Sequence, residues 1–307
     1  MAPDTAFDIL VAGEINPDLI LSGNVAPEFG QVEKLVDSAR LTIGSSSVIF
    51  ACGAARLGLK VGFIGVCGND IFGRFMLDEM SKRGVDVGNV IVRSDGQTGL
   101  SLILNNGSDR AILTHPGLID ELQASAIPET LLRQARHLHV ASYFLQTKLQ
   151  PDLPALFHRA RSLGLTTSLD TNYDPSEAWL GFDELLAVTN VFLPNEVEAK
   201  SLTAAENAET AASRLGPRVD ALAIKLGKDG ALGVQKRQRV RAESIPAKVV
   251  DTVGAGDSFD AGFIYGYLHG WDLEKSLRLA CVCGALSTQQ AGGTNGQPTL
   301  EEALSYL

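Results

Sequence analysis

The sequence predicts an α/β fold built on a doubly wound, mostly parallel sheet. Short apolar runs alternate with helical segments along most of the chain, and glycines recur where these segments end. Hydrophobic residues make up 45% of the chain and charged residues 20%, as in ordinary globular proteins. A chain of 307 residues can bury a full core. We therefore expect residues 1–307 to form a single α/β domain.

The expected elements follow one another in regular order. Strands are expected in apolar runs that end in small or polar residues: Phe7–Gly13, Lys60–Val66, His137–Ser142, Thr166–Asn172, Val191–Asn195 and Ala221–Gly227. Helices are expected between them, and the clearest are Ser47–Leu57, Phe72–Arg83, Pro151–Leu163 and Glu196–Leu215. Gly58 and Gly84 follow the first two as helix stops. Two final helices are expected to begin near Asp257 and Asp272.

Two segments interrupt this alternation. Asp18–Ile43 has weak strand signals and loops, and Thr98–Pro116 holds two alternating runs, Gly99–Leu104 and Arg110–Thr114, around an Asn-Gly pair. Asn-Gly favours a hairpin, because both residues tolerate a positive φ. A hairpin with alternating faces does not belong inside a parallel sheet. We therefore expect a small β-sheet lid over the strand ends, formed by about residues 14–44 and 95–117.

Charge and cysteine content exclude several classes of protein. The net charge is −10, and no basic stripe suited to nucleic acid is present. The densest basic run, Lys236–Arg241, is expected at a solvated hairpin tip. The four cysteines form no metal-binding motif and are expected to be small buried hydrophobes. Without an 18-residue apolar run or signal-peptide features, we expect no membrane association and a cytoplasmic location.

The segment from residue 251 to residue 263 carries the sharpest chemical signal. Gly254-Ala255-Gly256 is a turn with little side chain, and a helix follows directly. Unpaired N–H groups at a helix start can bind an anion. Asp257 lies beside that position, where we expect the helix dipole to keep it ionised at pH 7, able to accept a hydroxyl proton. For a lone Gly-x-Gly-Asp, an N-cap aspartate after a glycine turn is the more common interpretation. The P-loop and dinucleotide fingerprints are both absent.

The whole 251–263 string resembles the C-terminal signature of the ribokinase-like (PfkB-type) carbohydrate kinase family. Further matches run in the family's order across nearly the full chain, at residues 13–18, 54–58, 65–73, 170–175 with Trp179, 194–198, 225–230 and 292–294. The resemblance implies that Asp257 is the general base toward a sugar hydroxyl. It also implies that the amides of Gly254, Ala255 and Gly256 form the anion hole for the transferred phosphoryl group.

The resemblance also implies contacts to ATP and to metal ions. Lys225, Gly227, Gly230 and Thr252 would lie along ATP, together with Asn195. Asn195 and Glu198 can share one face at a strand-to-helix junction, where the family organises Mg²⁺ and its waters. Taken alone, this pair would be a helix cap. Asp251 matches a position that holds a monovalent cation such as K⁺ in some members, although it could equally brace its own loop.

Acceptor-binding residues are expected near the N-terminus. Asn16 and Asp18 alternate by two on an extended segment, so both can face one cleft, with Gly44 and Ser45 beside them. A carboxylate can grip a vicinal diol through two hydrogen bonds. Ile49 stands where ribokinase-like members have a sugar-binding Asn, which makes ribose less favoured unless the adjacent serines replace that contact. Cys281 stands where many members have an Asn near the nucleotide.

These observations favour an ATP-dependent sugar kinase that transfers the γ-phosphate of ATP to a hydroxyl of a small carbohydrate, with Mg²⁺ and a monovalent cation as cofactors. A nucleoside kinase of the same fold is the first alternative. A sugar-binding regulator without turnover is the second. Relatives dimerise through the lid hairpin, so a homodimer through the lid is a further hypothesis that the sequence does not decide.

Overall fold

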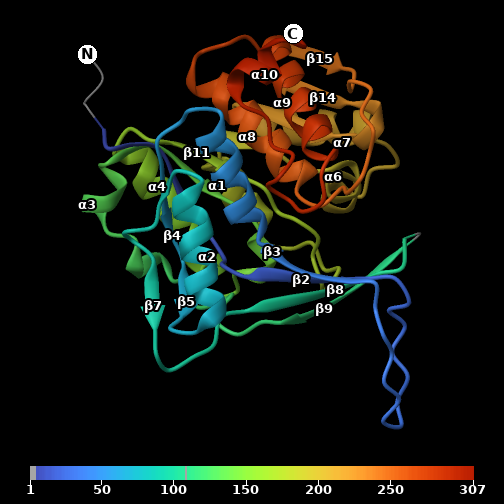
Figure 1. Ribbon diagram of the computed structural model, residues 1–307. Coiled ribbons are helices and arrows are strands. Elements are labelled where there is room, and N and C mark those ends of the chain that lie inside the picture. The colour runs from blue at the N-terminus through green and yellow to red at the C-terminus, as the bar shows by residue number, and fades with distance from the viewer. Residues whose placement is uncertain (1–4, 108) are drawn as a thin grey trace.

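The computed structural model describes residues 5–107 and 109–307, and a nine-stranded sheet forms its centre (Figure 1). The strands, from one edge to the other, are β15 (Gln238–Ala242), β14 (Ala231–Gln235), β13 (Ala221–Lys225), β12 (Val191–Phe192), β11 (Thr166–Leu169), β10 (Ala135–Val140), β1 (Phe7–Ala12), β4 (Val61–Ile64) and β6 (Val85–Asp86). All neighbours from β13 to β6 pair in parallel, whereas β14 and β15 add an antiparallel edge. The predicted fold class is confirmed.

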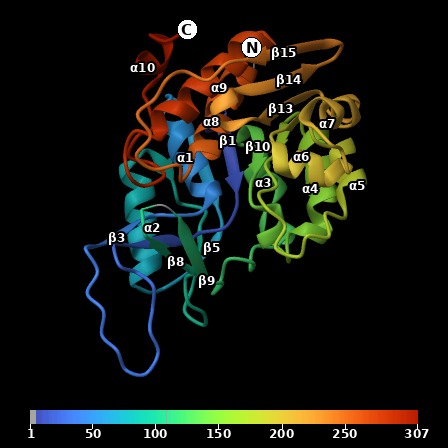
Figure 2. The same cartoon turned by 90° about the vertical axis from the view of Figure 1, so that its right-hand side faces the viewer.

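Helices cover both faces of this sheet (Figure 2). One face packs against α1 (Ser46–Arg56), α2 (Ile71–Lys82), α8 (Ala255–Leu268), α9 (Leu273–Ser287) and α10 (Leu300–Leu304). The other packs against α3 (Glu129–Leu132), α4 (Leu153–Ser162), α5 (Phe182–Ala187), α6 (Glu196–Thr203) and α7 (Ala208–Leu215). Strand β1 shows why both layers form, because Ile9 and Val11 enter one core while Leu10 and Ala12 enter the other.

Three predicted elements have different bounds in the structure. The segment expected as one helix, Glu196–Leu215, is two helices, because Ala204 adopts a left-handed conformation with φ 49° and Asn207 caps a new helix. The helix expected to begin near Asp257 begins at Ala255, immediately after the glycine turn. The strand expected to end at Val66 is interrupted after Ile64, and β5 (Val66–Gly68) pairs with β7 (Ile91–Arg93) instead.

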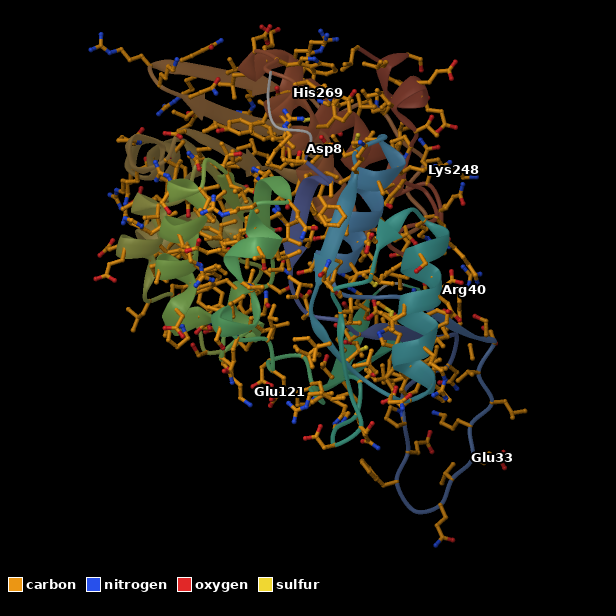
Figure 3. The ribbon with its side chains drawn as sticks, turned by 90° about the vertical axis from the view of Figure 1, so that its left-hand side faces the viewer. Asp8, Glu33, Arg40, Glu121, Lys248 and His269 are labelled. Atoms are coloured by element: carbon orange, nitrogen blue, oxygen red, sulfur yellow. The ribbon has the colours of Figure 1, made fainter. Side chains whose placement is uncertain are left out.

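A second, four-stranded sheet lies beside the carboxyl ends of the central strands. Its order is β3 (Ser38–Ile43), β2 (Pro17–Ser22), β8 (Leu100–Asn105) and β9 (Arg110–His115). The predicted hairpin is confirmed, since β8 and β9 pair antiparallel, and Ser108 of its loop lies outside the described residues. We call this the lid sheet. The segment between β2 and β3, which carries Glu33, projects away from the body of the molecule (Figure 3).

The basic run and the cysteines lie as the sequence predicts. Strands β14 and β15 form a hairpin with Lys236 in its turn, and both arginines of β15, Arg239 and Arg241, are exposed. All four cysteines are buried and carry free thiols. Between residues 5 and 307, leaving out residue 108, no helix is both long and apolar enough to cross a bilayer.

A buried pair of histidines crosses the centre of the sheet. The side chains of His137 and His139 both bond to the Ser168 hydroxyl, at 2.6 and 2.7 Å, and His139 stacks on Phe50. Burial lowers the pKa of His137 to about 3 and holds that of His139 well below its ordinary value. Burial therefore favours the neutral form of both rings in the folded chain, and unfolding makes protonation easier.

This pair predicts a specific dependence of stability on pH. A histidine with a lowered folded pKa destabilises the fold as pH falls below about 6.5, by about 1.4 kcal/mol per pH unit for each ring. Asp18 and Glu198, whose pKa values are raised to about 7, stabilise the fold as pH falls. Their contribution is the same in wild type and in a histidine variant, so the difference between the two reports on the histidine. The free energy of urea unfolding should be measured between pH 5 and 6.5. Its change per pH unit should be less positive, or more negative, for His139→Leu than for wild type. His158→Leu, at an exposed position, should keep the wild-type slope.

Candidate active site

Two cavities meet at the carboxyl ends of the central strands, the usual place for ligands in such sheets. One has a volume of about 440 Å³ and lies between the lid sheet, the start of α1 and the start of α8. The other, of about 590 Å³, lies between α8, α9 and the loop after β15. We call them the acceptor cavity and the nucleotide cavity. Four of the predicted site residues line both: Lys225, Gly227, Thr252 and Gly256.

The glycine turn has the geometry that anion binding requires. Gly254 has φ 73°, and a Cβ there would lie 2.8 Å from the carbonyl oxygen of Gly293. The Ala255 N–H donates to the Thr252 carbonyl at 3.3 Å. Among the described residues, the N–H groups of Gly256 and Asp257 donate to no backbone carbonyl. The start of α8 therefore offers free donors toward the boundary between the two cavities.

Asp257 lies in the first turn of α8 and lines the acceptor cavity. Burial and the nearby Asp170 carboxylate raise its pKa well above the ordinary value, against the attraction of Lys225 and a hydrogen bond from Ser46. The helix dipole, which favours the ionised form of Asp257, is therefore opposed by burial. The dipole contributes about 0.3–1 kcal/mol, whereas burying a charge costs several kcal/mol. A raised pKa makes the deprotonated carboxylate a stronger base.

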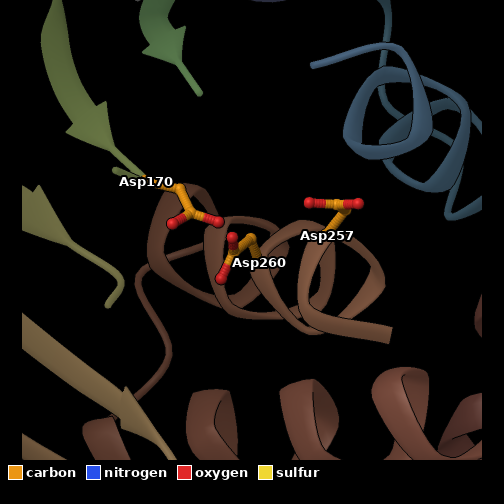
Figure 4. A group of neighbouring side chains, drawn as sticks. All are labelled: Asp170, Asp257 and Asp260. Carbon is orange, nitrogen blue, oxygen red and sulfur yellow. The ribbon is translucent and has the colours of Figure 1, made fainter. Parts of the chain in front are cut away.

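Lys225 is held between two buried carboxylates below Asp257. Its Nζ lies 2.9 Å from Asp170 Oδ2 and 3.0 Å from Asp260 Oδ2. Burial alone would raise the pKa of Asp170, but Lys225 and hydrogen bonds, one of them from Asp260, lower it. Burial and the Asp170 charge raise the pKa of Asp260. Lys225 and the hydrogen bond between Asp170 and Asp260 compensate this carboxylate pair, and Figure 4 shows both aspartates beside Asp257.

Asn195 and Glu198 form the helix cap that the sequence left open, and they do so at the acceptor cavity. They make a capping box at the start of α6, in which Glu198 N–H donates to Asn195 Oδ1 and Asn195 N–H donates to Glu198 Oε2, both at 2.9 Å. Both residues also line the acceptor cavity. Burial and Asp170 raise the pKa of Glu198 to about 7. This concentration of carboxylates is a donor set suited to a hydrated Mg²⁺.

The predicted acceptor residues take different places. Asp18 and Ser45 line the acceptor cavity, and burial together with Asp251 raises the pKa of Asp18 to about 7. Asn16 does not line it, because its side chain donates to Ser101 Oγ at 3.4 Å. Gly44 leaves space for the Asp18 side chain, since a Cβ at Gly44 would lie 2.2 Å from the Asp18 carboxylate.

Ile49 and Cys281 lie where the resemblance placed them. Ile49 lines the acceptor cavity and gives it an apolar wall near Gly254. Cys281 lines the nucleotide cavity, whose other walls include Ile245, Val249 and Phe259. The apolar character of this second cavity suits a purine ring.

Asp251 braces its own loop. One carboxylate oxygen accepts from Val253 N–H at 3.0 Å and the other from Gly292 N–H at 2.9 Å. Asp251 lines neither cavity, although Val253 beside it lines the acceptor cavity.

A serine network behind the acceptor cavity is absent from the sequence prediction. The buried Glu14 carboxylate accepts hydrogen bonds from the hydroxyls of Ser45, Ser47 and Ser142, at 3.0, 2.5 and 2.8 Å. Asn172 then donates to Ser142 and to Ser46, at 2.8 and 2.7 Å. The network fixes the start of α1. The main role of the Ser45–Ser47 run is therefore to position the wall of the acceptor cavity, and not to replace the asparagine expected at position 49.

The sequence analysis also did not identify two other candidate functional residues, Asp260 and Arg110. Asp260 carries a usable signal, because it lies three residues after Asp257 and shares its helix face. Arg110 lines the acceptor cavity from β9, and only the strand register places it there.

Comparison with known proteins agrees with this geometry. The model of the pfkB family carbohydrate kinases matches residues 8–300. The chain belongs to the PfkB family of carbohydrate kinases. It is 31% identical to a 2-dehydro-3-deoxygluconokinase of Bacillus subtilis, over 92% of this chain and 91% of that protein. It is also 31% identical to an ATP-dependent ribose-1-phosphate kinase of Halopiger xanaduensis, over 97% of each chain.

A solved structure shows the same fold. A putative ribokinase II of Escherichia coli, in complex with ATP and Mg²⁺, superposes with a TM-score of 0.86 at 23% identity and covers 98% of each chain. The predicted resemblance is therefore confirmed, and the chain is a sugar kinase.

Proposed function

We propose that this PfkB kinase transfers the γ-phosphoryl group of ATP to a hydroxyl of a small carbohydrate, with Asp257 as the general base. The proposal rests on one observation above all. Asp257 faces the acceptor cavity from the same helix start whose Gly256 faces both cavities. A hydroxyl in the acceptor cavity would lose its proton to Asp257 as the free N–H groups of Gly256 and Asp257 stabilise the phosphoryl group.

The other residues position the two substrates. Asp18 would accept hydrogen bonds from acceptor hydroxyls, and Ser45 would add a polar contact beside it. Lys225, Gly227 and Thr252 line both cavities and would contact the ATP phosphates, while Gly230 shapes the nucleotide side. Transfer between aligned groups needs mainly position and charge stabilisation.

Mg²⁺ would be held near Glu198 and Asn195, in part through water, and would supply charge neutralisation between the ATP phosphates. A nearby cation would favour the ionised form of the buried Glu198 carboxyl, whose pKa is raised to about 7. Asp170 adds negative charge to the same position.

Glu198→Gln tests this role. The Gln amide can keep the capping box but attracts a hydrated cation less, so the Mg²⁺ concentration for half-maximal rate should rise. The rate should be titrated with MgCl₂ at fixed ATP. Glu196→Gln is the matched control, because it removes the same charge from the same helical turn without lining either cavity. An unchanged Mg²⁺ titration in Glu198→Gln would leave that residue as a helix cap alone.

An ATP-consumption screen tests the function itself. It should cover ketoses, aldoses, sugar acids, sugar phosphates and nucleosides. Sugar acids and sugar phosphates belong in it because the two relatives are named for a gluconate derivative and for ribose 1-phosphate. Turnover of a nucleoside alone would favour a nucleoside kinase. ATP and sugar binding without turnover would favour a silent regulator.

We further infer that the Asp251 loop binds a monovalent cation such as K⁺. The support is its place beside the anion hole, since Asp251 holds Val253 and Gly292 on either side of the glycine turn. A cation in this loop would stabilise the start of α8. Comparing rates in potassium and in sodium chloride at equal ionic strength tests the inference, and equal rates would contradict it.

We also propose a homodimer through the lid sheet. The register places leucines on the face opposite Asp18, and the more exposed of them are Leu41 and Leu113, at 37% and 59%. The others on this face are half-buried: Leu19, Leu21, Leu102 and Leu104. A second copy would cover this apolar face, and sedimentation velocity tests it.

A cytoplasmic location fits the four buried free thiols and is testable by cell fractionation.

A further inference from the structure

Arg110 lies on the wall of the acceptor cavity that the lid sheet forms. In the register of β8 and β9, Ser101 pairs with Thr114 and Ile103 with Ile112, and Asp18 pairs with Ser101. Because side chains alternate along a strand, Arg110 projects from the same face as these residues. Asp18, Ser101, Ile103, Ile112 and Arg110 all line the acceptor cavity.

Arg110 and Lys225 differ in how their positive charges are compensated. The cavity has two cationic side chains, Lys225 and Arg110. Asp170 and Asp260 neutralise Lys225 at 2.9 and 3.0 Å. Within residues 5–107 and 109–307, the Arg110 guanidinium makes no hydrogen bond or ion pair, although it lies near enough to Asp18 to lower that residue's pKa against the effect of burial.

The rest of the cavity makes this cation informative. Four carboxylates line it, from Asp18, Asp170, Glu198 and Asp257, and the chain as a whole carries a net charge of −10. A neutral sugar offers hydroxyl oxygens to a guanidinium but no negative charge to compensate it. An anionic acceptor would lie beside the acidic side chains of this cavity, so a cation facing its charged group would favour its binding. A guanidinium binds a carboxylate or a phosphate through two parallel hydrogen bonds.

We propose, building on the acceptor site described above, that the acceptor is a small sugar carrying a carboxylate or phosphate group and that Arg110 binds that group. Asp18 holds acceptor hydroxyls beside it. Ile103 and Ile112 form the apolar wall that adjoins Arg110 on the lid sheet. Arg110 therefore selects the acceptor and takes no part in the proton transfer at Asp257.

Steady-state kinetics with four probes tests the proposal: 2-dehydro-3-deoxygluconate, ribose 1-phosphate, ribose and fructose. Wild type should prefer one of the two anionic probes, and the preferred one identifies the anion. Arg110→Gln should raise KM for that probe about 10- to 150-fold, as for the loss of a charged hydrogen-bonding partner. Its KM for ATP should stay unchanged, and Arg110→Lys should restore part of the loss because it keeps the charge but not the planar fork.

Arg40→Gln is the matched control. Arg40 pairs with Ile20 in the lid sheet and is exposed on the same face, but it does not line the acceptor cavity. Removing this charge should leave every KM near wild type. An equal effect of both variants would assign the loss to the general field of the lid sheet and would overturn the specific role of Arg110.

Calorimetric binding of the same probes, with ADP and Mg²⁺ present, separates this inference from the proposed function. Anion binding that depends on Arg110 supports the inference even if no probe is phosphorylated. Turnover of ribose or fructose with equal constants in wild type and Arg110→Gln keeps the kinase function and overturns the inference. If wild type binds neither anionic probe, the inference is also overturned.

Discussion

Asp257→Asn should fold, bind ATP and lose turnover. Asparagine keeps the shape of the side chain but cannot accept the hydroxyl proton, so kcat should fall about 10²- to 10⁴-fold. Stability should change little, because burial and Asp170 already favour the uncharged form of this carboxyl group. The measurements are kcat on the best acceptor, ATP affinity by calorimetry, and the midpoint of urea unfolding.

Asp272→Asn is the control for this variant. Asp272 also lies at a helix start, where it caps α9, but it lines neither cavity. Asparagine is an equally good N-cap, so both stability and kcat should remain at wild-type values. If Asp257→Asn retained near-wild-type kcat while Asp272→Asn behaved as expected, Asp257 would not be the base.

Lys225→Met should cause the largest loss of stability among the changes considered. The ammonium lies 2.9 Å from Asp170 and 3.0 Å from Asp260, and both carboxylates are buried. Removing one partner of a buried ion pair leaves an uncompensated charge, which typically costs about 3–5 kcal/mol. The free energy of unfolding in urea measures this cost. Activity should fall as well, because Lys225 lines both cavities.

A second substitution separates electrostatics from packing. Adding Asp170→Asn to Lys225→Met removes the stranded charge and should recover part of the lost stability. Lys228→Met provides the baseline, because Lys228 is exposed and lies three residues further along. It should change the free energy of unfolding by less than about 0.5 kcal/mol. If the double variant were no more stable than Lys225→Met, the loss would come from packing and not from the unpaired carboxylate.

Local sequence was sufficient to determine the sheet with helices on both faces and the glycine turn that precedes Asp257. Alternating apolar runs and helical segments specify a parallel sheet covered on both faces, because each element must bury its own apolar side. The Gly254–Asp257 turn specifies a helix start with free N–H groups, since the φ of 73° at Gly254 is a conformation that favours glycine. These features depend on neighbouring residues in the chain, and local chemistry reveals them.

Only the tertiary structure decided the direction of the pKa shifts and which residues of the lid sheet line the acceptor cavity. Burial raises the pKa of Asp257, and the Asp170 carboxylate, which follows β11, raises it further; no local pattern reports either effect. Lys225 is neutralised by Asp170 and Asp260, which come from elements 55 and 35 residues away. Arg110 reaches the acceptor cavity through the register of β8 and β9, in which a shift by one residue would turn it to the opposite face. Electrostatic energy depends on distance and burial, so sequence alone supplies the charged groups and the fold determines what each of them does.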